Sequence, residues 1–154
     1  MKILVLSDSH GKVKNMLAAA GQEAPDMIIH LGDYARDCGA LRVNCPDLSV
    51  KCVRGNCDGN APGLDTDEFT VGQKHFFITH GHLFGVKRNT DSLIQHGLCA
   101  GADIVLYGHT HYQDMTHIGE MLLVNPGSIG YDRDYAVIEI IDGVLTVKMK
   151  HLSR

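Results

Sequence analysis

The chain has 154 residues, of which 44% are hydrophobic and 21% are charged, and its formal net charge is −4. These values are typical of a soluble globular protein and argue against a disordered or fibrous one. At this length we expect one domain that spans residues 1–154. The negative charge disfavours a nucleic-acid partner, because surfaces that bind nucleic acid are usually basic.

The start of the chain and its cysteines predict the compartment. The apolar run at residues 3–6 is far shorter than the ~20 residues that cross a membrane, and it lacks the features of a secretion signal. The five cysteines are odd in number and contain no CxxC pair, which argues against both a disulfide framework and a zinc ribbon. We therefore expect a cytoplasmic protein with no membrane contact.

The first half of the chain alternates short apolar runs with polar loops. Each run has the length of a buried strand, and a helical pattern follows the first polar loop. We expect strands at residues 2–7, 27–31 and 50–53, and a helix at residues 13–23.

The second half continues this pattern and ends in strands of alternating character. Apolar strands with intervening helices favour a parallel or mixed sheet, and a terminal hairpin at Asp142-Gly143 favours antiparallel additions. The predicted fold is α/β, a two-sheet β-sandwich of mixed sheets flanked by helices. We expect strands at residues 74–79, 103–107, 120–124, 135–141 and 144–150, and a helix at residues 88–98.

Five polar clusters carry most of the unusual side chains, and each follows a predicted apolar strand. Because the ends of neighbouring strands meet at one edge of a sheet, the clusters can form one site. Residues two apart in an extended segment point to the same side, so paired residues within a cluster can face that site together. The clusters are Asp8-Ser9-His10, Gly32-Asp33, Gly55-Asn56-Cys57-Asp58, His80-Gly81-His82 and Gly108-His109-Thr110-His111.

Carboxylate, imidazole and amide oxygen together form a mixed nitrogen and oxygen ligand set. Such a set suits Mn, Fe, Zn or Ni better than Ca or Mg alone. The glycines within the clusters permit tight turns and let the backbone pass close to a metal or a phosphate. The clusters therefore predict a transition-metal site at the strand ends.

Single residues of the clusters have simpler alternative roles. Asp8 and Asp33 could cap helices, and Asn56 could be a turn residue that tolerates a left-handed backbone. His10 or His80, taken alone, could be a hydrogen-bonded structural histidine. The shared position of all five clusters favours the metal site over these alternatives. The histidines outside the clusters are expected to be structural or exposed; they are His30, His75, His96, His117 and His151.

The clusters resemble the calcineurin-like metallophosphoesterase superfamily, whose pattern is D-x-H, G-D, G-N-H-D/E, H and G-H-x-H. The match runs from Asp8 to His111 in the same order. The short length, the GNCD form and the later Asn125-Pro126-Gly127-Ser128 resemble the small phosphodiesterases of the YfcE type within it. The resemblance implies a four-layer α/β fold and two divalent metal ions per chain. Manganese is the expected metal, with nickel, iron and zinc as alternatives.

The resemblance also implies a role for each motif residue. Asp33 would bridge the two ions, and a hydroxide shared by ions roughly 3.5–4 Å apart would attack a phosphodiester in line. The catalytic set is then Asp33, Asn56, Asp58 and His82. The ligands of one ion would be Asp8, His10, Asp33 and His111, and those of the other Asp33, Asn56, His80 and His109.

The chain departs from the family pattern at Cys57, where many relatives have histidine. A thiol that titrates at about 8.5 and hydrogen-bonds weakly is a poor proton donor or phosphate clamp, and Cys57 could simply be a small buried residue. His82 is the candidate replacement acid, with a supporting or exposed position as the alternative, and Asp58 could orient a ligand or the substrate. Asn56, Cys57 and His82 are the expected substrate contacts. We therefore expect weak activity on esters with poor leaving groups.

Two other functions stay open. One is a catalytically weak, protein-binding scaffold like the retromer subunit of this fold, which the complete ligand set disfavours. The other is a nuclease of the same superfamily, which the negative charge and the lack of a basic, aromatic stretch disfavour. Because no insertion between the motifs is long enough to form a cap, we expect an open site for a small phosphoester substrate. We also expect a homodimer or a higher homo-oligomer.

Overall fold

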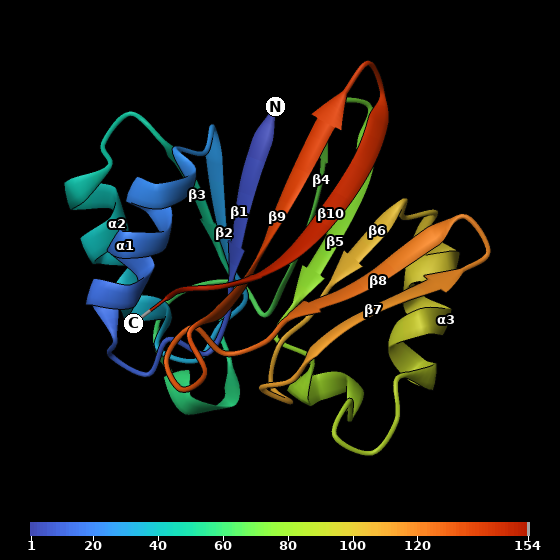
Figure 1. Ribbon diagram of the computed structural model, residues 1–154. Helices are drawn as coiled ribbons and strands as arrows, with labels where there is room; N and C mark the ends of the chain where they lie inside the picture. Colours follow the sequence, from blue (N-terminus) through green and yellow to red (C-terminus); the bar gives the residue numbers. More distant parts are fainter. Residues whose placement is uncertain (154) are drawn as a thin grey trace.

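The computed structural model describes residues 1–153, which form two five-stranded sheets and three α-helices (Figure 1). The helices are α1 (Val13–Glu23), α2 (Cys38–Asn44) and α3 (Asp91–Ala100). The strands are β1 (Lys2–Leu6), β2 (Met27–His30), β3 (Ser49–Cys52), β4 (Thr66–Val71), β5 (Lys74–Thr79), β6 (Ile104–Leu106), β7 (Gln113–Ile118), β8 (Met121–Pro126), β9 (Asp134–Ile141) and β10 (Val144–His151).

Both sheets are mixed: the antiparallel pairings lie on one side of the first sheet and at both edges of the second. The strand order is β10-β9-β1-β2-β3 in the first sheet and β4-β5-β6-β8-β7 in the second. β1 pairs in parallel with β2 and β2 with β3, as β5 does with β6 and β6 with β8. Figure 1 shows α1 and α2 beside the first sheet and α3 beside the second. The predicted α/β sandwich of two mixed sheets flanked by helices is confirmed.

The central strands of each sheet are apolar on both faces, which explains why they read as continuous apolar runs. In β1, Ile3 and Val5 join the core between the two sheets, whereas Leu4 and Leu6 join the core under α1 and α2. A third core forms between the second sheet and α3, with Phe77 and Leu93 among its members. Burial on two faces at period 2 is the expected pattern for a covered central strand.

Most predicted elements are found close to their predicted bounds, and the hairpin turn is confirmed by positive φ values of 51° at Asp142 and 77° at Gly143. Three elements were not predicted: α2, β4 and β7. α2 has only seven residues, and β4 and β7 are edge strands with many polar side chains. Within the described residues, no helix has both the length and the apolar character needed to cross a membrane.

Tyr135 of β9 provides a test of the core beneath α1. Its side chain is fully buried, and its hydroxyl donates a 2.8 Å hydrogen bond to Glu23, which also accepts one from Lys150. Removing a donor from a buried carboxylate costs about 1–3 kcal/mol. We expect Tyr135→Phe to lower the free energy of unfolding in urea by this amount, and Tyr131→Phe, at an exposed tyrosine, to leave it unchanged. Equal stability of the two variants would contradict this account.

Candidate metal centre

The five polar clusters meet where the carboxyl ends of the parallel strands come together. In the first sheet, Asp8, Asp33 and Asn56 follow β1, β2 and β3. In the second sheet, His80 and His109 follow β5 and β6. Since ligands bind beyond the carboxyl ends of parallel strands, the topology of the two sheets assembles the cluster from distant parts of the chain.

The first group of candidate ligands consists of Asp8, His10, Asp33 and His111, whose ligand atoms all lie within 4.8 Å of one another. His111 Nε2 is 3.1 Å from Asp8 Oδ1. His10 Nε2 is 3.9 Å from the same oxygen and 3.8 Å from Asp33 Oδ2. Two carboxylates and two imidazoles therefore converge on one position.

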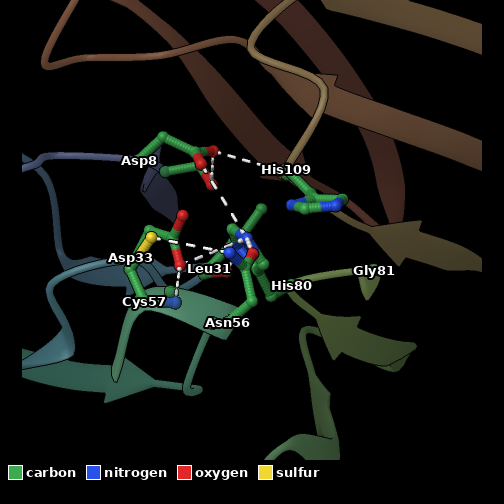
Figure 2. Close-up of polar contacts among 12 residues, drawn as sticks. Asp8, Leu31, Asp33, Asn56, Cys57, His80, Gly81 and His109 are labelled. Atoms are coloured by element: carbon green, nitrogen blue, oxygen red, sulfur yellow. Dashed lines mark hydrogen bonds and ion pairs between the residues drawn. The ribbon is translucent and has the colours of Figure 1, made fainter. Parts of the chain in front are cut away.

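The second group consists of Asp33, His80 and His109, again with all ligand atoms within 4.8 Å (Figure 2). His80 Nε2 lies 3.4 Å from Asp33 Oδ1 and 3.2 Å from Asn56 Oδ1, so the Asn56 amide oxygen joins this group. Both groups contain Asp33. The structure thus brings together all seven side chains that the sequence suggested as ligands, with Asp33 common to both groups.

Two buried atoms in the first group have no hydrogen-bond partner among the described residues. They are Asp8 Oδ1 and His10 Nε2, and both face the point where the first group converges. A buried polar atom without a partner costs about 1–3 kcal/mol, which a bound cation would offset. Carboxylate oxygens and imidazole nitrogens are also the donors that a divalent transition metal takes. The residues present therefore fit the implied metal ions.

Left-handed backbone conformations are concentrated at this site. Asp8, His10, Asp33, His109 and His111 all have positive φ, between 44° and 70°. For residues other than glycine this region is uncommon and mildly strained, although Asp and His enter it more readily than most. Strain that gathers at five candidate ligands is typical of a functional site, where surrounding contacts hold the backbone in place.

The charge of Asp33 is maintained by its neighbours. Burial alone would raise the pKa of this carboxyl, but the hydrogen bond and charge of His80, together with the 2.9 Å hydrogen bond from the Cys57 backbone N–H, hold it well below its usual range. The His80 ring in turn donates from Nδ1 to the Leu31 carbonyl at 2.8 Å. This hydrogen bond turns Nε2 toward Asp33 and Asn56, where it can bind a metal.

Two histidines near His80, His82 and His109, are biased toward the neutral ring. Burial and the nearby charges of His80 and Lys87 lower the pKa of His109 to about 4. Burial and His80 also lower the pKa of His82, whose ring lies 5.5 Å from that of His80. Neutral imidazole is the form that binds metal.

Asp58 fixes the loops around the site rather than facing the ligand atoms. Its carboxylate accepts hydrogen bonds from the backbone N–H groups of Asp33 (3.1 Å), Ala35 (2.8 Å) and Gly55 (2.7 Å). It thereby ties the loop that carries Asp33 to the loop that carries Asn56. This contact supports the predicted orienting role of Asp58.

The simpler alternatives for four residues are wrong. Neither Asp8 nor Asp33 caps a helix, because α1 and the 3₁₀ turn at Ala35–Asp37 begin without a side-chain cap. Asn56 does not have a positive φ, so it is not a left-handed turn residue. Cys57 is exposed beside the site rather than buried in a core. Partial burial and the charges of Asp33, Asp58 and Asp8 raise its pKa to about 11.

Several residues that support the site were not predicted from the sequence. The Asp37 carboxylate accepts 2.8 Å hydrogen bonds from Ser9 Oγ and from the Gly11 N–H, which shapes the loop after β1. Ser7 donates to Asp8 at 2.5 Å. Asn125 donates to the Gly108 carbonyl at 3.0 Å, and Ser128 to the Asp8 carbonyl at 2.9 Å. The NPGS segment was the signal in the sequence for Asn125 and Ser128. These two residues connect the segment to the loop that carries His109 and to the loop that carries Asp8.

Comparison with known proteins agrees with this geometry. A family model described as the calcineurin-like phosphoesterase superfamily domain matches residues 1–148. The chain is 31% identical over 156 residues to the probable metallophosphoesterase YsnB of Bacillus subtilis, covering 96% of this chain and 89% of that protein. It is 30% identical over 153 residues to the phosphodiesterase YfcE of Escherichia coli K12, covering 84% and 79%.

Solved structures show the same fold. The crystal structure of a predicted phosphoesterase from Streptococcus pneumoniae matches with a TM-score of 0.81 at 30% identity, covering 96% of this chain and 87% of that one. Vps29 of Entamoeba histolytica, crystallised with zinc, matches with a TM-score of 0.74 at 18% identity, covering 97% and 98%, which shows a common fold alone. The family model and two relatives at 30% identity or more cover most of the chain, which therefore belongs to the calcineurin-like phosphoesterase superfamily.

Proposed function

We propose that this protein is a phosphodiesterase that works with two divalent metal ions per chain. The observation that carries the proposal is the pair of ligand groups that share Asp33. Relatives of similar length are named phosphodiesterase or probable metallophosphoesterase, which supports the same reaction class. We further propose manganese as the metal, with nickel, iron and zinc as alternatives.

The chain's own residues would hold and orient the reacting groups. Asp8, His10 and His111 would hold one ion and Asn56, His80 and His109 the other, and Asp33 belongs to both ligand groups. When bound, such ions lower the pKa of water toward about 7 and neutralise phosphate charge. The low pKa of Asp33 and of His109 keeps both side chains free of the protons that would compete with metal near neutral pH.

The substrate would approach from the side of Cys57 and His82. Both lie at the edge of the ligand cluster, and Asn56 Nδ2 is 3.5 Å from Cys57 Sγ. Because its pKa is raised to about 11, the Cys57 thiol is protonated near neutral pH, so it adds no charge that would repel a phosphate. We propose that a small phosphoester binds here, in a cytoplasmic and self-associating protein that uses neither membrane nor nucleic acid.

The direct test is hydrolysis of bis-p-nitrophenyl phosphate and p-nitrophenyl phosphate by chelator-stripped protein, with and without added manganese. We expect manganese to restore cleavage, with the diester preferred. Asp33→Asn keeps the side-chain size and should lower the restored rate by about 100-fold or more, the scale for loss of one charge-stabilising group. A protein that binds manganese and cleaves neither ester would instead be a scaffold, and full activity of Asp33→Asn would refute the shared ligand.

Gly55 provides a second test, because it lies against the shared carboxylate. A Cβ at Gly55 would overlap Asp33 Oδ1 and stand 2.5 Å from the Asp33 backbone nitrogen. We expect Gly55→Ala to displace Asp33 and to lower the metal content of purified protein at both positions. Gly21→Ala is the matched control, because a Cβ there meets nothing within 4 Å. Equal metal content in the two variants would show that the close approach has no such effect.

Cys57→His tests the departure from the family pattern. A histidine at this position can protonate a leaving group, and general acid catalysis contributes at least about 100-fold. We expect the variant to gain most on esters with poor leaving groups and little on nitrophenyl esters, whose leaving group needs no proton. Cys99→His on α3, where the thiol is also exposed, controls for an added imidazole. If Cys57→His leaves the rates on both kinds of ester unchanged, Cys57 does not limit activity.

A further inference from the structure

Two of the five cysteines lie in contact, at the ends of the loops that carry Asp33 and Asn56. Cys38 is the first residue of α2, and Cys52 is the last residue of β3. Their Sγ atoms are 2.7 Å apart, although 13 residues separate them in the sequence. Both lie within 4.8 Å of a ring nitrogen of His30. We propose that Cys38 and Cys52 form a reversible disulfide by exchange with a small anionic disulfide.

The two thiols differ in their accessibility, as an exchanging pair requires. Cys38 is fully buried, whereas Cys52 is half-buried and lines a cavity of about 310 Å³. Cys52 lines the cavity and Cys38 does not, so a disulfide that enters the cavity would meet Cys52 first. Cys52 would attack first, and Cys38 would resolve the product.

Positive charge surrounds this cavity. Arg36, Arg42 and Arg54 all line it. Arg54 is paired with Asp65 at 2.7 Å, but Arg36 stacks on the Tyr34 ring at 4.6 Å, and Arg42 donates to the Val50 carbonyl at 3.3 Å. Within residues 1–153, no carboxylate lies within 4.0 Å of either Arg36 or Arg42. The cavity therefore favours an anion, and glutathione disulfide carries several carboxylates.

The surroundings of Cys52 also favour its reactive form. The hydrogen bond from Cys38 lowers the pKa of Cys52 to about 5 against the opposing effect of burial, and the charge of Arg42 acts in the same direction. His30 is held in place, with Nε2 3.0 Å from Ser9 Oγ and Nδ1 accepting the Gly32 N–H at 3.2 Å. A thiolate is the nucleophile in disulfide exchange.

The exchange proceeds in two balanced steps. The Cys52 thiolate attacks one sulfur of glutathione disulfide, breaks its S–S bond and releases one glutathione thiolate. Cys38 then gives its proton to the released glutathione thiolate and attacks Cys52 Sγ, which forms the Cys38–Cys52 bond, breaks the mixed disulfide and releases the second glutathione as a thiolate. Two protein thiols are oxidised, one disulfide is reduced to two thiols, and excess glutathione reverses the reaction.

Peptide mapping tests the proposal without reference to phosphoesterase activity. Trypsin cleaves after Arg36, Arg42, Lys51 and Arg54, so Cys38, Cys45 and Cys52 fall on separate peptides. The whole protein is treated with glutathione disulfide, its free thiols are alkylated, and it is digested. We expect the peptide of residues 37–42 to be linked to the peptide of residues 52–54. Treatment of the oxidised protein with excess glutathione should restore both thiols. If Cys57 and Cys99 carry glutathione while Cys38 and Cys52 are alkylated, the proposal is overturned.

Variants separate the two steps and the role of charge. Cys38→Ser should stop the reaction at a glutathione adduct on Cys52, and Cys52→Ser should leave Cys38 unmodified. Arg42→Gln should slow exchange with glutathione disulfide by about tenfold relative to exchange with neutral hydroxyethyl disulfide. An equal effect on both reagents would refute the anion preference. Zinc released from purified protein by thiol-blocking reagents, and absent from Cys38→Ser, would show a metal site at these residues and overturn the disulfide.

Discussion

The carboxylate of Asp33 is the group on which the rest of the site depends. Oδ1 faces His80 and accepts the Cys57 N–H, while Oδ2 faces His10 in the other ligand group. Burial disfavours a charge at this position, so the surrounding donors must keep the carboxyl ionised. The site is therefore arranged around the buried Asp33 carboxylate, whose two oxygens face the two ligand groups.

The loop that carries Asp33 and the loop that carries Asn56 are held together beside the Asp33 carboxylate. Asp58 binds backbone N–H groups on both loops, and Gly55 leaves room for the carboxylate because it has no Cβ. Cys38 and Cys52 lie at the far ends of the same two loops, where α2 begins and β3 ends. A covalent bond between these thiols would therefore connect the segments that carry Asp33 and Asn56.

The fold and the ligands could be predicted from the sequence because both depend on local patterns. Apolar runs located the central strands, and polar residues directly after those runs located the ligands, as for Asp8 after β1. Elements without an apolar run, such as the edge strand β4, could not be predicted. The supporting contacts could not be predicted either, because they join distant residues: Asp37 and Gly11 are 26 positions apart, and Asn125 and Gly108 are 17 apart. Similarly, the cysteine pattern gave no sign that Cys38 contacts Cys52.

The most direct test of the account is the position of the metal ions in crystals grown with manganese, located by anomalous diffraction. The account predicts two peaks roughly 3.5–4 Å apart, both in contact with Asp33. One peak should also contact Asp8, His10 and His111, and the other Asn56, His80 and His109. A single peak, or two peaks without Asp33 as a common ligand, would contradict the shared carboxylate on which the proposed phosphodiesterase function rests.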